Sequence, residues 1–182
     1  MDLIFTITLV FHIIGITIAI GSATLTDYLH LIALRKSSLE KGIVKLYPYI
    51  SKLINYSLIL IYTSGIILVM LKPELLQSPL FIIKFLLVLL VTINGIYLQK
   101  IITPQLERCV IKGNKYCTSN VLYGSVIGGS ISIVTWYSIL ILALTKTLGY
   151  TLTQFLTAYV IVLILAIISA YILEKRARTW RE

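Results

Sequence analysis

Four ionisable side chains lie within long apolar stretches of the sequence, and they are the first candidates for chemistry. His12, Asp27 and His30 belong to one stretch, Phe11 to Leu34 (FHIIGITIAIGSATLTDYLHLIAL), and Lys84 belongs to a later one. Ionisable groups are costly inside a membrane, and they usually face the interior of a helical bundle or a water-filled path. An imidazole could ligate a haem iron, whereas a carboxylate could form part of a proton or ion path.

Residues around the two histidines form one stripe if the stretch is a helix. They follow the i, i+3, i+7 rhythm of a helical face, and they are His12, Gly15, Ala19, Ser22, Thr26 and His30. The small residues in the middle would allow close approach of either a neighbouring helix or a planar ligand. The histidines are 18 residues apart, about 27 Å along a straight helix, so within one chain they cannot ligate the same iron or metal ion.

Each histidine, if it is a metal ligand, would therefore need a second ligand from another helix or another subunit. Lys84 is the candidate for His12. A symmetric dimer could instead bring two copies of one histidine together. The alternative for both histidines is a hydrogen bond between helices, with His30 paired to Asp27 near the membrane surface.

Composition places the whole chain in a membrane. Of its 182 residues, 58% are hydrophobic and only 13% are charged, and the mean hydropathy is +0.96. Soluble domains carry about 25% charged residues. We expect an all-α integral membrane protein that forms a single domain over residues 1–182. The net charge is +9, but the basic residues lie beside apolar spans, so we expect no nucleic-acid partner.

Five stretches are long enough to cross a bilayer as helices, which takes about 20 apolar residues. The predicted spans cover residues 3–25, 49–71, 79–102, 121–144 and 152–173, and the first continues as helix to about Leu34. Pro48 and Pro79 suit helix starts, where a missing N–H costs little. The third span is expected to end before Pro104.

The distribution of basic residues predicts the orientation of the bundle. Cytoplasmic loops are enriched in Lys and Arg, and 13 basic residues fall on one predicted side against two, Lys72 and Lys146, on the other. We therefore expect the N-terminus outside and the C-terminus in the cytoplasm, with the protein in the plasma membrane of a prokaryote. The 13 residues are Arg35, Lys36, Lys41, Lys45, Lys52, Lys100, Arg108, Lys112, Lys115, Lys175, Arg176, Arg178 and Arg181.

Polar residues of the predicted spans divide into two layers. By the helix rise, His12 would lie about 14 Å and Lys84 about 8 Å from the outer surface, so they could share an outer layer. The inner layer, in the cytoplasmic half, would hold Asp27, His30, Asn55 and Asn94.

The fourth span carries a glycine pair and an aromatic pair. Gly124-x-x-x-Gly128 is a pattern of closely packed membrane helices. Trp136 and Tyr137 follow past the middle of the membrane, where Trp136 would either line the same cavity as His12 or fill the core.

Two stretches of the sequence resemble a group of small haem-associated membrane proteins. HIIGITIAIGSATLTDYLH resembles the first span of the HemJ-type protoporphyrinogen oxidases, the CopD copper-resistance family and an uncharacterised family allied to them. SPLFIIKFLLVLLVTINGIYL resembles their third-span pattern of an aromatic residue, a lysine and a long aliphatic run. SGIILVMLKPELLQSPLFIIK and SISIVTWYSIL look closest to the uncharacterised relatives.

This resemblance implies a haem b cofactor, with His12 as axial ligand, Lys84 as the matching lysine and His30 loosely at the place of a second histidine. Gly15, Ala19 and Ser22 would then leave space against the ring. The first hypothesis is therefore a b-type haem protein in electron transfer or haem-linked oxidation. If it is an enzyme, it would be a HemJ-like membrane oxidoreductase.

Two other functions remain open. The inner layer could be a proton or ion path in a small transporter or channel subunit. Alternatively, the polar residues could hold helices together in a structural accessory subunit. Beyond the lipid bilayer, we expect the partner to be a second copy of the chain or a larger membrane complex, because polar helix faces are better buried in an oligomer.

Overall fold

The computed structural model describes residues 2–35, 45–112, 119–148 and 151–179. Nearly all of these residues are helical and none lies in a β-strand, which confirms the all-α fold class. The elements are α1 (Asp2–Arg35), α3 (Tyr47–Leu71), the 3-10 helix η1 (Pro73–Gln77), α4 (Pro79–Tyr97), the π-helical turn η2 (Leu98–Ile102), α5 (Thr103–Lys112), α6 (Ser119–Leu148) and α7 (Leu152–Thr179).

Five of these helical stretches are long and apolar enough to cross a membrane, as the sequence predicts. They cover Leu3–Leu29, Tyr47–Leu71, Pro79–Arg108, Asn120–Ala143 and Leu152–Ile172. Pro48 lies in the first turn of α3 and Pro79 opens α4, so both prolines occupy the positions expected of them.

The predicted end of the third span before Pro104 is wrong, because the helix continues through η2 and α5 to Lys112. Proline removes a backbone donor and crowds the carbonyl four residues earlier. That carbonyl belongs to Lys100, which lies inside the π turn. Bonds in a π turn reach five residues instead of four, so the widened backbone accepts the proline without ending the helix.

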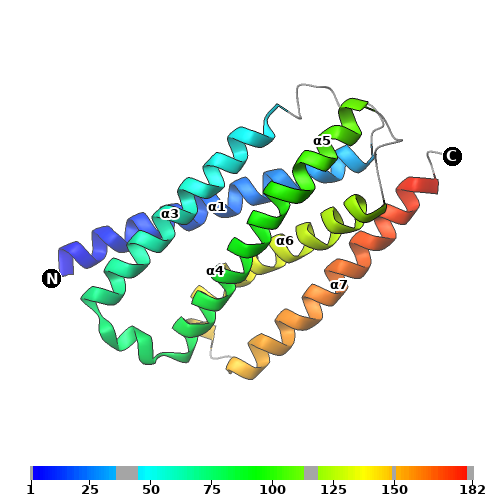
Figure 1. The fold of residues 1–182 in the computed structure, drawn as a ribbon. Helices are drawn as coiled ribbons and strands as arrows, with labels where there is room; N and C mark the ends of the chain where they lie inside the picture. Colours follow the sequence, from blue (N-terminus) through cyan, green and yellow to red (C-terminus); the bar gives the residue numbers. More distant parts are fainter. Residues whose placement is uncertain (1, 36–44, 113–118, 149–150, 180–182) are drawn as a thin grey trace.

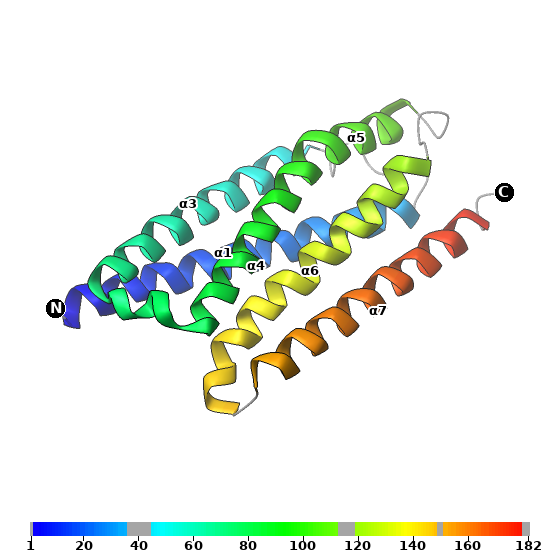
Figure 2. The same ribbon diagram turned by 60° about the horizontal axis from the view of Figure 1, so that its bottom comes forward.

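Helix α6 is the centre of the bundle. It packs against α4, α7 and α1, and α1 also packs along α3 (Figures 1 and 2). Of the α6 span 56% is buried, against 6% of the α7 span, so α7 lies at the edge of the bundle with most of its surface exposed. The core is built from α1, α3, α4, α6 and α7, with Ala19, Ile61, Val91, Trp136 and Phe155 among its members.

Basic residues gather toward one end of the bundle. The C-terminal ends of α1, α5 and α7 lie together at the end opposite the N-terminus (Figures 1 and 2). These helix ends carry Arg35, Lys112 and Arg178, whereas Lys72 lies at the other end, in the turn between α3 and η1. The charge asymmetry inferred from the sequence is therefore also an asymmetry along the bundle axis.

Gly124 and Gly128 lie where α6 meets α4 and η2, as the close-packing pattern predicts. A Cβ atom on Gly124 would come within 2.5 Å of Ile102 Cδ1, and one on Gly128 within 2.5 Å of Leu98 Cδ2. Without side chains, these two positions let the helices approach closely. Asn94 reinforces the contact, because its Nδ2 donates a hydrogen bond of 2.9 Å to the carbonyl of Gly128.

Candidate functional site

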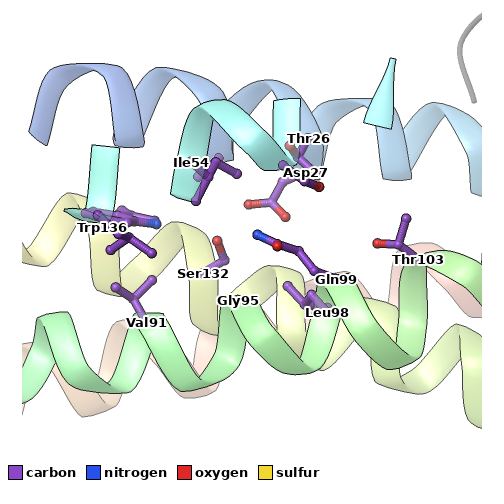
Figure 3. Close-up of a pocket in the computed structure, with 13 residues that line it drawn as sticks. Thr26, Asp27, Ile54, Val91, Gly95, Leu98, Gln99, Thr103, Ser132 and Trp136 are labelled. Atoms are coloured by element: carbon purple, nitrogen blue, oxygen red, sulfur yellow. The ribbon is translucent and has the colours of Figure 1, made fainter. Parts of the chain in front are cut away.

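A small polar cavity lies between α1, α3, α4 and α6, and its volume is about 40 Å³. Apolar side chains such as Ile54, Val91 and Trp136 form part of its wall, while Gly95 contributes bare backbone (Figure 3). A cavity needs about 10–15 Å³ of such volume to hold one water, so this one has room for a small ion or a few waters. Its polar lining consists of Thr26, Asp27, Ser51, Gln99, Thr103 and Ser132.

Asp27 is the one ionisable residue of this lining, and it is almost completely buried, with 4% of its surface exposed. One carboxylate oxygen lies close to α6, since a Cβ on Gly129 would be 3.3 Å from Oδ1. Ser132 forms a side-chain hydrogen bond with the carboxylate. The other oxygen, Oδ2, has no hydrogen-bond partner within the described part of the chain. Buried polar atoms are nearly always paired, so Oδ2 lacks the partner that such an atom normally has.

Gln99 brings an amide to the same cavity from the π turn η2. Its side chain, the Asp27 carboxylate and the Ser132 hydroxyl point toward one another from three different helical segments (Figure 3). The Gln99 amide also pairs reciprocally with Asn55 on α3, through Nδ2–Oε1 and Nε2–Oδ1 contacts of 3.2 Å and 3.3 Å. Each amide oxygen keeps a second lone pair and each nitrogen a second hydrogen, so Gln99 can still bind an occupant of the cavity.

The predicted inner layer is therefore brought together only in part. Asp27 lines the cavity, and Asn55 reaches it through Gln99. Asn94 is buried but instead bonds the backbone of Gly128 between α4 and α6. The side chain of His30 lies outside the described part of the structure, so its roles as metal ligand and inner-layer residue stay predictions.

Asp27 also lies deeper in the bundle than its place near the end of the first span suggests. Its carboxylate meets Gly129 and Ser132, at the middle of the span Asn120–Ala143 of α6. Helix α1 is 34 residues long, and a crossing needs only about 20. The extra length lets the second half of α1 reach the centre of α6.

His12 lies on α1 and Lys84 on α4, and their shared outer layer stays a prediction. Nδ1 of His12 is 2.8 Å from Oγ of Ser64 on α3. The Ser64 hydroxyl donates to the carbonyl of Leu60, so its oxygen accepts from the Nδ1–H group. Nε2 is then left with the lone pair that a metal would require.

This tautomer of His12 would suit a haem ligand. The packing of the small-residue stripe, however, does not fit a haem. A Cβ on Gly15 would be 3.1 Å from Ile61 Cγ1 and 3.4 Å from both Leu60 Cγ and the Ser57 carbonyl oxygen. Ala19 is 0% exposed and Ser22 is buried as well. The stripe is thus covered by a neighbouring helix, one of the two alternatives left open by the sequence. Trp136 belongs to the core, which was one of its two predicted places, and it also lines the Asp27 cavity.

A transition-metal centre is likewise not formed by the described residues, among which no three His, Cys, Asp or Glu side chains gather. The cavity around Asp27 offers only oxygen and amide donors, which suit protons, water and hard cations. The cavity can therefore bind a proton, water or a hard cation beside a buried carboxylate.

Gln99 and Thr103 were not identified as candidates in the sequence. They follow the aliphatic run of the third span and stand beside Lys100, where polar residues normally mark the membrane surface. The π turn carries the helix onward and brings both residues to the cavity. The spacing of four between the polar residues Gln99 and Thr103, which places them on one helical face, was the available signal.

Comparisons with known proteins leave the family of the chain open. No protein-family model, no curated protein and no solved structure matches it, so the likeness to the HemJ-type and CopD proteins stays a resemblance of short stretches.

Proposed function

We propose that the protein is a small cation transporter or channel subunit and that the cavity around Asp27 is its ion site. The observation that carries this proposal is a carboxylate with 4% exposure that lines a polar cavity level with the middle of the α6 span and has one unpaired oxygen. An ionisable group in the interior of a membrane bundle is costly, and it typically marks an ion or proton path. A site built only to hold helices together would pair both oxygens.

The proposed topology places the N-terminus outside and the basic end of the bundle in the cytoplasm. The membrane is proposed to be the plasma membrane of a prokaryote. Since α7 leaves most of its surface to lipid, a homodimer or a larger complex has an accessible face in the membrane plane.

Filling the cavity is expected to stop transport without disturbing the fold. Gly95 lines the cavity, and a Cβ there would meet nothing within 4 Å. Gly95→Val therefore adds volume at the site while leaving the charge of Asp27 in place. In liposomes holding trapped Na⁺- and pH-sensitive dyes, the variant is expected to lose most of the wild-type cation flux.

Gly21→Val is the matched control. Gly21 is the other helical glycine whose Cβ would meet nothing within 4 Å, but it is exposed on α1 and does not line the cavity. This variant should transport as the wild type does. Wild-type liposomes that conduct neither Na⁺ nor protons, or equal flux in both valine variants, would refute the proposal and favour the structural accessory subunit.

The b-type haem protein is the second candidate, for electron transfer or haem-linked oxidation. The tautomer of His12 supports it. A haem on His12 requires α3 to move away from Gly15, because the two are now in contact.

An absorption spectrum decides this second candidate. The packing of α1 against α3 predicts that protein expressed with ample haem and then reduced with dithionite shows no Soret band. A Soret band that disappears in His12→Ala would establish the haem protein and show that α1 and α3 part. His12→Ala that merely lowers the melting temperature would identify a packing role.

A further inference from the structure

We infer that the occupant of the Asp27 cavity is a monovalent alkali cation such as Na⁺, held by the carboxylate of Asp27. This inference rests on the proposed function and names its substrate class. It follows from the donor atoms and the charge of the cavity, and the volume allows water to complete the set of ligands.

The donor atoms favour a hard cation. The polar lining supplies a carboxylate, hydroxyl groups and one amide, and no histidine or cysteine takes part among the described residues. Thr26 Oγ1 donates to the carbonyl of Ser22 at 2.9 Å, so only its lone pairs remain for the cavity. Gln99 Oε1 accepts from Asn55 and keeps one lone pair. Oxygen donors of this kind suit alkali and alkaline-earth ions and not zinc or copper.

The charge favours a monovalent ion. Asp27 is the one acidic residue of the lining, and no lysine or arginine of the described chain lines the cavity. One positive charge therefore neutralises the site. A divalent ion would leave one positive charge uncompensated in the bundle, where desolvation makes such a charge costly. Calcium sites use six to eight oxygens with several carboxylates, and magnesium keeps several of its waters.

The volume of the cavity leaves room for water beside the ion. One water needs about 10–15 Å³ of cavity volume measured in this way, and the cavity offers about 40 Å³. Waters can therefore complete the shell of ligands that the protein oxygens begin.

Melting temperature in different salts tests the inference on the full chain in detergent. NaCl is titrated against choline chloride at constant ionic strength, with KCl and MgCl₂ in parallel. An ion that binds the folded state raises its stability by mass action. Wild type is expected to show a saturable rise with Na⁺ that Mg²⁺ does not reproduce, and Asp27→Asn is expected to show none. Glu74→Gln, which neutralises an exposed carboxylate in η1, should respond as the wild type does.

Thr26→Val keeps the inference testable if Asp27→Asn does not fold. It removes the hydroxyl and preserves the shape of the side chain, so we expect the half-saturating Na⁺ concentration to rise about tenfold. No saturable response to Na⁺, an equal response in Asp27→Asn, or tighter binding of Mg²⁺ would overturn the inference. Proton flux blocked by Gly95→Val without any response to Na⁺ would overturn it too, but would leave the proposed function standing. If the wild type conducts neither Na⁺ nor protons, both the inference and the proposed function are refuted.

Discussion

Replacing Asp27 by asparagine is expected to abolish transport and, in the same protein, to raise the melting temperature measured in choline chloride. The two side chains have the same shape, so the substitution removes the charge and little else. A buried ion with an unpaired oxygen costs several kcal/mol of stability, and Oδ2 is such an atom. The neutral amide avoids this cost and can pair with Ser132 and Gln99.

The expected sizes are a loss of cation flux of at least about tenfold, equivalent to about 1.4 kcal/mol in the barrier, and a rise in melting temperature of at least about 2 °C. Flux is measured in dye-loaded liposomes and melting by intrinsic fluorescence in detergent. Glu74→Gln should change neither quantity, because that carboxylate is exposed. A fall in melting temperature together with the loss of flux would instead identify Asp27 as a structural hydrogen-bonding residue.

A loss of flux together with a rise in melting temperature distinguishes a functional role of Asp27 from a structural one. Residues kept for packing lose stability when they are changed, whereas functional sites often carry groups that destabilise the fold. Na⁺ should reduce the difference in melting temperature between Asp27→Asn and the wild type, since it would stabilise only the wild type. The comparison in choline chloride is therefore the more sensitive one.

The helical spans could be predicted from the sequence because they depend on the length and hydropathy of each apolar stretch. Both quantities are given by the sequence itself. Pro48 and Pro79 added accurate starts, since proline is favoured in the first turn of a helix. The same reasoning about proline gave a wrong prediction at Pro104. A proline ends a regular α-helix, but the sequence does not reveal that a π turn precedes this one and accepts it.

The candidate site could be predicted only in part, because neighbouring helices decide which polar residues meet. Asp27 stood out as a carboxylate in an apolar stretch. Its partners depend on how α1 crosses α6, which no periodicity within α1 can show. The stripe of Gly15, Ala19 and Ser22 predicted close approach, and at Gly15 the approaching element is α3. Composition cannot distinguish a neighbouring helix from a flat ligand, because both require small residues.

Gly128→Val is expected to destabilise the protein more than the other substitutions discussed above. It should also reduce transport, although Gly128 does not line the cavity. A single added Cβ would already lie 2.5 Å from Leu98 Cδ2 and 3.1 Å from its Cγ, and valine adds two methyl groups. Overpacking of this kind costs about 1–3 kcal/mol. Leu98 lines the cavity beside Gln99, so its displacement moves the wall of the ion site. Melting temperature and liposome flux measure the two effects.

Truncating the neighbour should reverse much of this damage. Leu98→Ala alone is expected to destabilise by leaving a void, yet in the double variant the valine at position 128 has room to enter that void. The double variant should therefore be more stable than the sum of the two single changes predicts, as happens for residues in direct contact. Gly21→Val, exposed and without neighbours, controls for valine in a helix. Strict additivity would mean that Gly128 of α6 and Leu98 of η2 are not in contact, and would contradict the expected displacement of the cavity wall.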